Sequence, residues 1–210
     1  MPIITIHRVN TIDGLRGTDP GYGVEVDIRH DPESGRLYLN HELDRGDDFE
    51  EYIKIAAAKD CPLIILNIKE SGIERKVIEI VERYNIIDWF LLDVEFPFIF
   101  KSMKGDIENT AGRIAIRYSE SEPIEQALAL AGHFSWVWVD VNTLLPLNKE
   151  SYRKLRDAGY KLALVCPDRW GRPEDIPKYI EYMKKNNIMI DTVMTSTKHA
   201  EKWEKSGILI

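Results

Sequence analysis

The chain has 210 residues and a formal net charge of −7, with 44% hydrophobic and 30% charged residues. An acidic chain lacks the positive surface that binds nucleic acid by neutralising phosphates, so we expect no nucleic-acid partner. The apolar content excludes an intrinsically disordered or collagen-like chain, and the length favours a single domain over residues 1–210. Two cysteines, Cys61 and Cys166, are too few for a disulfide framework and favour a reducing compartment.

The N-terminal segment and the apolar stretches argue against export and membrane insertion. The segment from Met1 to Arg8 has no basic region followed by a long apolar stretch, as a signal peptide would. The longest apolar stretches have the length of a strand, well below the roughly 20 residues of a membrane-spanning helix. We therefore expect a cytoplasmic protein with no integral membrane segment, and the sequence leaves its oligomeric state open.

Short β-branched segments alternate with amphipathic segments along the chain, as in α/β proteins. The predicted strands are 3–7, 24–29, 63–69, 89–95, 113–118, 136–141, 161–166 and 192–196. The predicted helices are 49–59, 73–84, 123–131, 149–158 and 176–185. In the helix at 73–84, apolar residues recur at the spacing of one buried face. Gly132 and Gly159 follow two of the helices, where a left-handed residue commonly ends a helix.

Eight strands separated mostly by helices predict an α/β fold, a single small (β/α)₈ TIM barrel. An open doubly wound sheet is the structural alternative. The first crossover, residues 9–23, is irregular because it is rich in glycine and has hardly any helical periodicity. We expect no full-length helix there. A short extended segment follows the second strand at residues 37–40.

Polar side chains stand at the carboxyl ends of the first six predicted strands. They are His7 and Arg8, Glu25 and Asp27, Asn67 and Lys69, Asp93 and Glu95, Arg117, and Asp140 and Asn142. Residues i and i+2 of a strand point to the same face, and in a barrel the carboxyl ends of the strands surround the active site. The pattern therefore predicts a polar site at this end of the sheet.

Glu25 and Asp27, here called the acidic pair, carry the clearest local signal. Two carboxylates on one face of a strand repel each other, so a buried position requires a compensating cation. Hard oxygen ligands suit Mg²⁺ or Ca²⁺ better than zinc. The alternative is a pair of rim carboxylates bridged to a nearby arginine.

His7 and His41 are the histidines predicted to lie near the acidic pair. Histidine titrates near neutral pH, so two of them can supply a general base and a general acid. Arg8 and Lys69 add donors for an anionic substrate, Arg as a planar fork and Lys as a point charge. The other histidines are expected elsewhere, His30 facing away from the acidic pair and the other two on the surface: His133 and His199.

This part of the chain resembles the opening of the glycerophosphodiester phosphodiesterases, a family of phosphatidylinositol-phospholipase-C-like TIM barrels. The resemblance rests on His7-Arg8, on the segment Gly23-Val24-Glu25-Val26-Asp27, on Asn40-His41-Glu42 and on the strand at 63–69. It covers residues 3–70, and the later strands agree in layout only.

The resemblance implies specific roles. His7 and His41 match the acid–base histidines, Arg8 and Lys69 match phosphate-contacting groups, and Glu25 and Asp27 match ligands of a divalent cation. Asn67 stands where the family has a third metal-binding carboxylate, so it would offer an oxygen without charge, and Asp93 is a possible substitute. Val9 replaces a glycine, Glu42 replaces an aspartate, and the Glu-Asn-Thr segment that usually follows is missing.

Together these features predict a metal-dependent phosphodiesterase of lipid metabolism that hydrolyses a small glycerophosphodiester-like molecule. Glu25, Asp27 and Asn67 would hold Mg²⁺ or Ca²⁺ while His7 and His41 move protons. One alternative is a catalytically silent barrel that binds phosphate or sugar through Arg8 and Lys69. Another is a cation-dependent sugar isomerase or a glycosidase, which would use the carboxylates of the second and fourth strands: Glu25, Asp27, Asp93 and Glu95.

Overall fold

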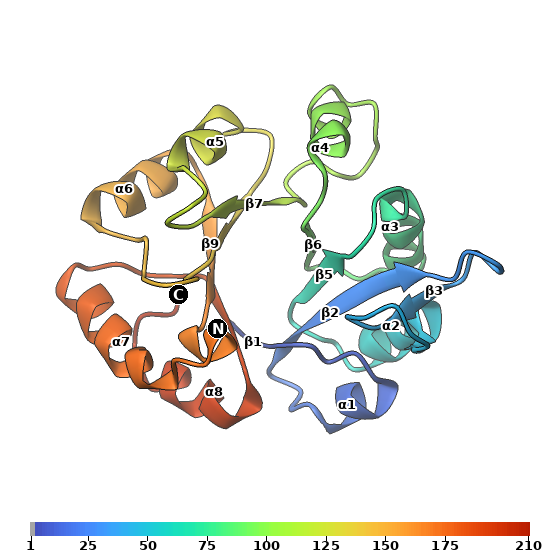
Figure 1. Cartoon of the computed structure of the whole chain (residues 1–210), viewed down its shortest axis with the longest axis horizontal. Coiled ribbons are helices and arrows are strands. Elements are labelled where there is room, and N and C mark those ends of the chain that lie inside the picture. Colours follow the sequence, from blue (N-terminus) through green and yellow to red (C-terminus); the bar gives the residue numbers. More distant parts are fainter. Residues whose placement is uncertain (1–2) are drawn as a thin grey trace. The chain divides into compact units, whose positions relative to one another are not determined.

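The computed structural model describes residues 3–210, which divide into two compact units. The first unit consists of Ile6–Thr110, and the second consists of Ala111–Ile210 together with the N-terminal residues up to Thr5. Each unit combines parallel strands with helices, so the predicted α/β class is confirmed (Figure 1). The closed barrel and the single domain stay predictions.

The first unit, blue to green in Figure 1, has five strands of mixed direction. They are β2 (Gly23–His30), β3 (Leu37–Leu39), β4 (Asp47–Asp48), β5 (Ile64–Ile68) and β6 (Trp89–Leu92). β5 pairs in parallel with β2 and β6, and β3 and β4 extend the other side of β2 as antiparallel strands. The helices of this unit are α1 (Ile12–Gly17), α2 (Phe49–Ala58), α3 (Glu74–Arg83) and α4 (Phe96–Met103).

β2 is a buried strand with two different faces. Val24, Val26 and Ile28 point to one face and are fully buried among apolar side chains. Glu25 and Asp27 point to the other face and are also buried, each only 1% exposed. The register sets Asp27 opposite Asn67 of β5, which brings their side chains to the same face.

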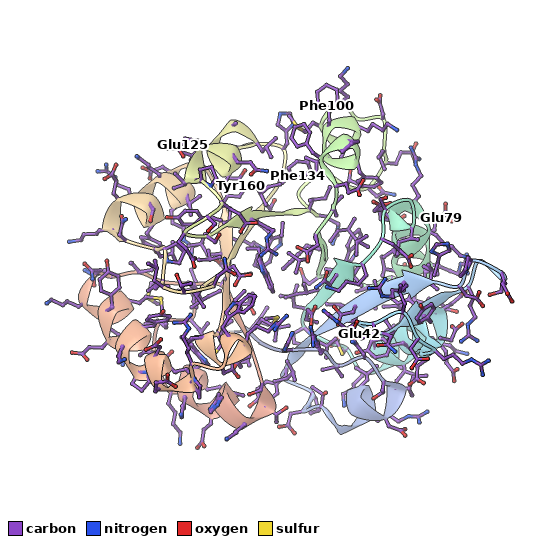
Figure 2. The ribbon with its side chains drawn as sticks, in the orientation of Figure 1. Glu42, Glu79, Phe100, Glu125, Phe134 and Tyr160 are labelled. Carbon is purple, nitrogen blue, oxygen red and sulfur yellow. The ribbon has the colours of Figure 1, made fainter. Side chains whose placement is uncertain are left out.

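The second unit, yellow to red in Figure 1, contains a run of parallel strands. They are β7 (Ala115–Tyr118), β8 (Trp136–Val139), β9 (Lys161–Val165) and β10 (Thr192–Thr195), with β1 (Ile3–Ile6) beside β10. The helices are α5 (Ile124–Ala129), α6 (Lys149–Asp157), α7 (Ile176–Lys185) and α8 (Thr197–Glu204), with short 3₁₀ helices at Pro167–Trp170 and Pro173–Asp175. Tyr160 joins β9 to α5, since its buried hydroxyl donates to the carbonyl of Ala127 at 2.6 Å (Figure 2).

All eight predicted strands and all five predicted helices are present, with ends shifted by a few residues. The irregular first crossover is confirmed as well, because α1 has only six residues. Gly159 follows α6 with a φ of 85°, the left-handed conformation that the sequence predicted there.

The fourth predicted strand is too long. β6 ends at Leu92, and Asp93 has a φ of 59°, which turns the chain away from the strand direction. Glu95 then precedes α4, which the sequence analysis did not predict. Asp93 and Glu95 are therefore not a same-face strand pair. At the outer end of this region, the ring of Phe100 in α4 is 45% exposed and points outward (Figure 2).

Two further details correct the sequence-based expectations. β8 ends at Val139, so Asp140 and Asn142 lie beyond the strand. His199 is buried rather than on the surface, because it belongs to α8, which the sequence analysis also missed. His133 is exposed as expected. Within residues 3–210, no helix combines the length and the apolarity needed to cross a membrane.

Candidate functional site

The candidate site lies in the first unit, on the face of β2 and β5 that carries the acidic pair. Glu25 is surrounded by groups from two short segments. Asn67 of β5 donates its Nδ2–H to Oε1 of Glu25 at 2.9 Å, and the backbone N–H of Arg8 donates to Oε2 at 2.8 Å. His7 Nε2 lies 3.9 Å from Oε2, close enough for an ion pair when the imidazole is protonated.

The turn after β1 wraps around Glu25. Arg8 has a φ of 54°, a left-handed conformation that is unfavourable for a residue with a side chain. This turn aims two successive backbone N–H groups at Glu25, since Val9 donates to the carbonyl of Glu25 at 2.9 Å. Val9 can stand where the family has glycine because the left-handed residue of this turn is Arg8 and not Val9.

Asp27 is held by nitrogen atoms from both sides. Lys69 Nζ lies 3.0 Å from Oδ1 of Asp27, and Arg8 Nε lies 3.7 Å from Oδ2. Asn10 makes two hydrogen bonds to the residue, donating to Oδ2 at 2.8 Å and accepting from the Asp27 backbone N–H at 2.9 Å. Asn10 is not among the site residues predicted from the sequence, although it directly follows Val9. The one feature of the sequence that could have indicated its role is an amide side chain two residues after Arg8.

The two carboxyl groups of the acidic pair differ in their pKa values. Burial, followed by the nearby charge of Asp27, raises the pKa of Glu25 to about 7, and the hydrogen bond from Asn67 only partly opposes this shift. Burial also acts to raise the pKa of Asp27, but the hydrogen bond from Asn10 and the charge of Lys69 outweigh it and lower that pKa below its ordinary value. Asp27 is therefore the firmly ionised member of the pair.

His41 lies in the loop after β3, which is attached to the strand end of β2. Asn40 donates its backbone N–H to the carbonyl of Asp27 at 3.1 Å, and the guanidinium of Arg29 donates to the carbonyl of His41 at 2.8 and 3.1 Å. His41 Nδ1 lies 2.5 Å from Oε1 of Glu42, and this hydrogen bond lowers the pKa of Glu42. This contact engages Nδ1 of His41 and not Nε2.

The nitrogen atoms around the acidic pair compete with a Mg²⁺ or Ca²⁺ ion for the carboxylate oxygens. Such ions bind oxygen atoms with available lone pairs. Here each of the four carboxylate oxygens lies within 3.0 Å of a nitrogen atom of the chain, but Oδ1 of Asp27 forms only an ion pair with Lys69 and has no hydrogen bond among the described residues. Asn67 presents its N–H, not its oxygen, to Glu25. Among residues 3–210, no group of three His, Cys, Asp or Glu side chains is placed to hold a metal, and the exposed Asp93 does not complete one.

A cavity of about 890 Å³ in the first unit lies away from this site. His30 and Glu70 line it together with residues of the 31–36 turn and the 43–46 loop. His30 Nδ1 lies 3.1 Å from Oε1 of Glu70. Because side chains alternate along a strand, these two residues point to the face opposite Asp27 and Lys69. The expectation that His30 faces away from the acidic pair agrees with this pairing.

Comparisons with known proteins find similarity of structure and none of sequence. No protein-family model matches the chain, and no curated protein matches it significantly. Among solved structures, a glycerophosphoryl diester phosphodiesterase from Parabacteroides distasonis ATCC 8503 aligns with a TM-score of 0.65, over 100% of this chain and 88% of that one. Its sequence identity is 13%, so the likeness concerns the fold. The chain thus has the fold of a protein described as a phosphodiesterase.

Proposed function

We propose that the protein is a phosphodiesterase-like hydrolase on a closed (β/α)₈ barrel, acting on a small glycerophosphodiester-like substrate. The observation that carries the proposal is the placement of His7 and Arg8 on the buried acidic pair, in a fold shared with a glycerophosphoryl diester phosphodiesterase. His41, held by Glu42 in the loop after β3, supplies a second imidazole.

Arg8 and Lys69 are the phosphate-binding groups in this proposal. Their side chains are 36% and 16% exposed, so neither is fully buried beside Asp27. A guanidinium and an ammonium together offset the charge of a phosphodiester and favour the more highly charged transition state of its hydrolysis.

His41 acts as the general base and His7 as the general acid. The Nε2 atom of His41 removes a proton from the attacking oxygen, which forms a bond to phosphorus. The bond from phosphorus to the leaving alcohol breaks, and protonated His7 donates its proton to the departing oxygen. With water as nucleophile the product is a phosphomonoester, and with a hydroxyl group of the substrate it is a cyclic phosphate. The buried carboxyl of Glu25, 3.9 Å from His7, stabilises the imidazolium form.

A phosphate-binding protein without catalysis is the second candidate function. It is favoured by the ion pair of Lys69 and the hydrogen bond of Asn10 with Asp27, because these contacts engage the polar groups of the site in the absence of substrate. The two candidates differ in turnover and share the binding groups. Binding without hydrolysis would select this alternative.

Hydrolysis of bis(p-nitrophenyl) phosphate and of a glycerophosphodiester tests the proposal. We expect His7→Ala and His41→Ala each to lower the rate by about 10²–10⁴-fold, the usual contribution of a general acid or base. His133→Ala, which removes an exposed histidine of the second unit, is the matched control and should keep full activity. If either site variant folds and keeps the wild-type rate, that histidine has no place in the mechanism.

A further inference from the structure

We infer that the ammonium group of Lys69, together with the amide of Asn67, takes the place of a divalent cation beside the acidic pair. The site would then bind an anionic substrate without a metal ion. The inference rests on the proposed function in one respect, since it takes this cluster as the place where the phosphate binds. It departs from the metal site that the sequence resemblance implies.

Lys69 has the position and the charge that this role requires. Its Nζ lies 3.0 Å from Oδ1 of Asp27, and its side chain is only 16% exposed. The lysine directly follows β5, and its backbone N–H donates to the carbonyl of Ile28 at 3.1 Å, which continues the ladder between β5 and β2. Residues 67 and 69 point to the same face, so the ammonium is directed at the carboxylates of β2.

The charges of the cluster balance without an added ion. The two carboxylates face two cationic side chains, with Lys69 at 3.0 Å and Arg8 at 3.7 Å from Asp27. A divalent cation would add two positive charges beside Lys69, next to carboxylates that are 1% exposed. Repulsion between the two cations is strong where water is largely excluded. A metal ion would therefore compete with Lys69 for Oδ1 of Asp27.

Asn67 contributes an N–H where a metal ligand would need an oxygen. Its Nδ2 donates to Glu25, whereas its Oδ1 is buried and has no hydrogen-bond partner among the described residues. Oδ1 of Asp27, the residue opposite Asn67 on β2, is likewise buried without a hydrogen bond among the described residues, and the ammonium of Lys69 at 3.0 Å is the cation that the chain itself places beside it.

Lys69 can serve Asp27 and a substrate at once. An ammonium group has three N–H donors, and that of Lys69 lies 3.0 Å from a single carboxylate oxygen, Oδ1 of Asp27. The other donors of Lys69, together with the planar guanidinium of Arg8, whose side chain is 36% exposed, are sufficient for phosphate oxygens. We therefore expect the affinity for a phosphodiester to be independent of divalent cations.

Mn²⁺ binding to the whole protein tests the inference directly. EPR spectroscopy separates free from bound Mn²⁺, and the melting temperature is measured in parallel with millimolar Mg²⁺, Ca²⁺ and Mn²⁺. For the wild-type protein we expect no bound Mn²⁺ at the acidic pair and a melting temperature constant within about 1 °C. Mn²⁺ that binds the wild-type protein and is lost in Asp27→Asn or Glu25→Gln overturns the inference.

Lys69→Met removes the ammonium and keeps an apolar stem, so the acidic pair should now bind Mn²⁺. The melting temperature should then rise by roughly 5 °C when the free ion is about a hundredfold above its Kd. Lys69→Arg keeps the charge, and Lys76→Met removes an exposed ammonium from the same unit. Neither control should gain Mn²⁺ binding. A folded Lys69→Met protein without Mn²⁺ binding contradicts the inference.

Asn67→Asp provides a second variant that retains the ammonium, in case Lys69→Met does not fold. The added carboxylate should give it a higher Mn²⁺ affinity than the wild-type protein, and an unchanged affinity contradicts the role of Asn67. Hydrolysis is measured separately. Activity that requires Mn²⁺ overturns the inference and leaves the proposed function standing. If the protein neither binds Mn²⁺ nor hydrolyses the substrate with any ion, the proposed function is overturned and the inference about Lys69 stands.

Discussion

Glu25 and Asp27 stand two residues apart on one strand face, yet the surrounding chain treats them differently. Lys69 and Asn10 supply a charge and a hydrogen bond to Asp27, whereas the two short hydrogen bonds to Glu25 come from neutral donors, the amide of Asn67 and the backbone of Arg8. Burial therefore dominates at Glu25 and raises its pKa to about 7, while that of Asp27 is lowered. The pKa values of Glu25 and Asp27 therefore differ because the two carboxyl groups have different partners.

The raised pKa of Glu25 predicts a pH-dependent stability. Between its ordinary value of 4.5 and about 7, the folded protein binds more protons at this group than the unfolded chain, so the free energy of unfolding falls as pH rises. Glu25→Gln removes this loss. Between the two limits, the variant should gain stability relative to the wild-type protein by up to about 3 kcal/mol.

Urea unfolding below pH 4.5 and above pH 7 measures this difference. Glu79→Gln, at an exposed position of α3, is the matched control and should leave the pH dependence unchanged (Figure 2). A stability difference between Glu25→Gln and the wild-type protein that does not change with pH would show that Glu25 titrates as an ordinary carboxyl group.

At the scale of elements, the loop between β3 and β4 decides where His41 lies. This loop reverses the chain direction between the two antiparallel strands, and Gly46 directly precedes β4 (Asp47–Asp48) and lies close to β3. A Cβ atom on Gly46 would lie 2.0 Å from the carbonyl oxygen of Leu39. No side chain fits there, so the position requires glycine for space.

Gly46→Ala should therefore displace the loop that carries His41. We expect a loss of about 1–3 kcal/mol in the free energy of unfolding, as for other overpacked positions, and a lower rate of phosphodiester hydrolysis. Gly21→Ala is the control, because nothing lies within 4 Å of the added methyl group, and it should be neutral or slightly stabilising. Equal stability and activity in the two variants would exclude this role of the loop.

Element boundaries show where sequence patterns stop being informative. The apolar period of α3 and the β-branched segments of β2 and β5 identify these elements without knowledge of their neighbours. The end of β6 was missed because the sequence around Asp93 keeps an apolar character while the backbone turns left-handed. α8 was not predicted, and His199 is buried because it lies on this helix; no local sequence pattern indicates that burial.

At the scale of the whole molecule, the order of strands and helices could be predicted, and the partners of the site could not. Glu25, Asp27 and Asn67 were expected together because alternation along β2 and β5 determines which side chains share a face. The orientation of the Asn67 amide, the contact of Asn10 with Asp27 and the left-handed turn at Arg8 depend on how distant segments meet. These contacts decide whether the cluster accepts a metal ion.

Hydrolysis of a glycerophosphodiester by the wild-type protein in EDTA, compared with the same assay in Mg²⁺, Ca²⁺ or Mn²⁺, tests the central claim most directly. The claim is that Lys69 and Arg8 compensate the phosphate charge at a site whose carboxylates already have partners within the chain. We predict hydrolysis in EDTA at a rate that added divalent ions leave unchanged. A protein that is inactive in EDTA and regains its activity with a divalent ion would contradict this account of the site.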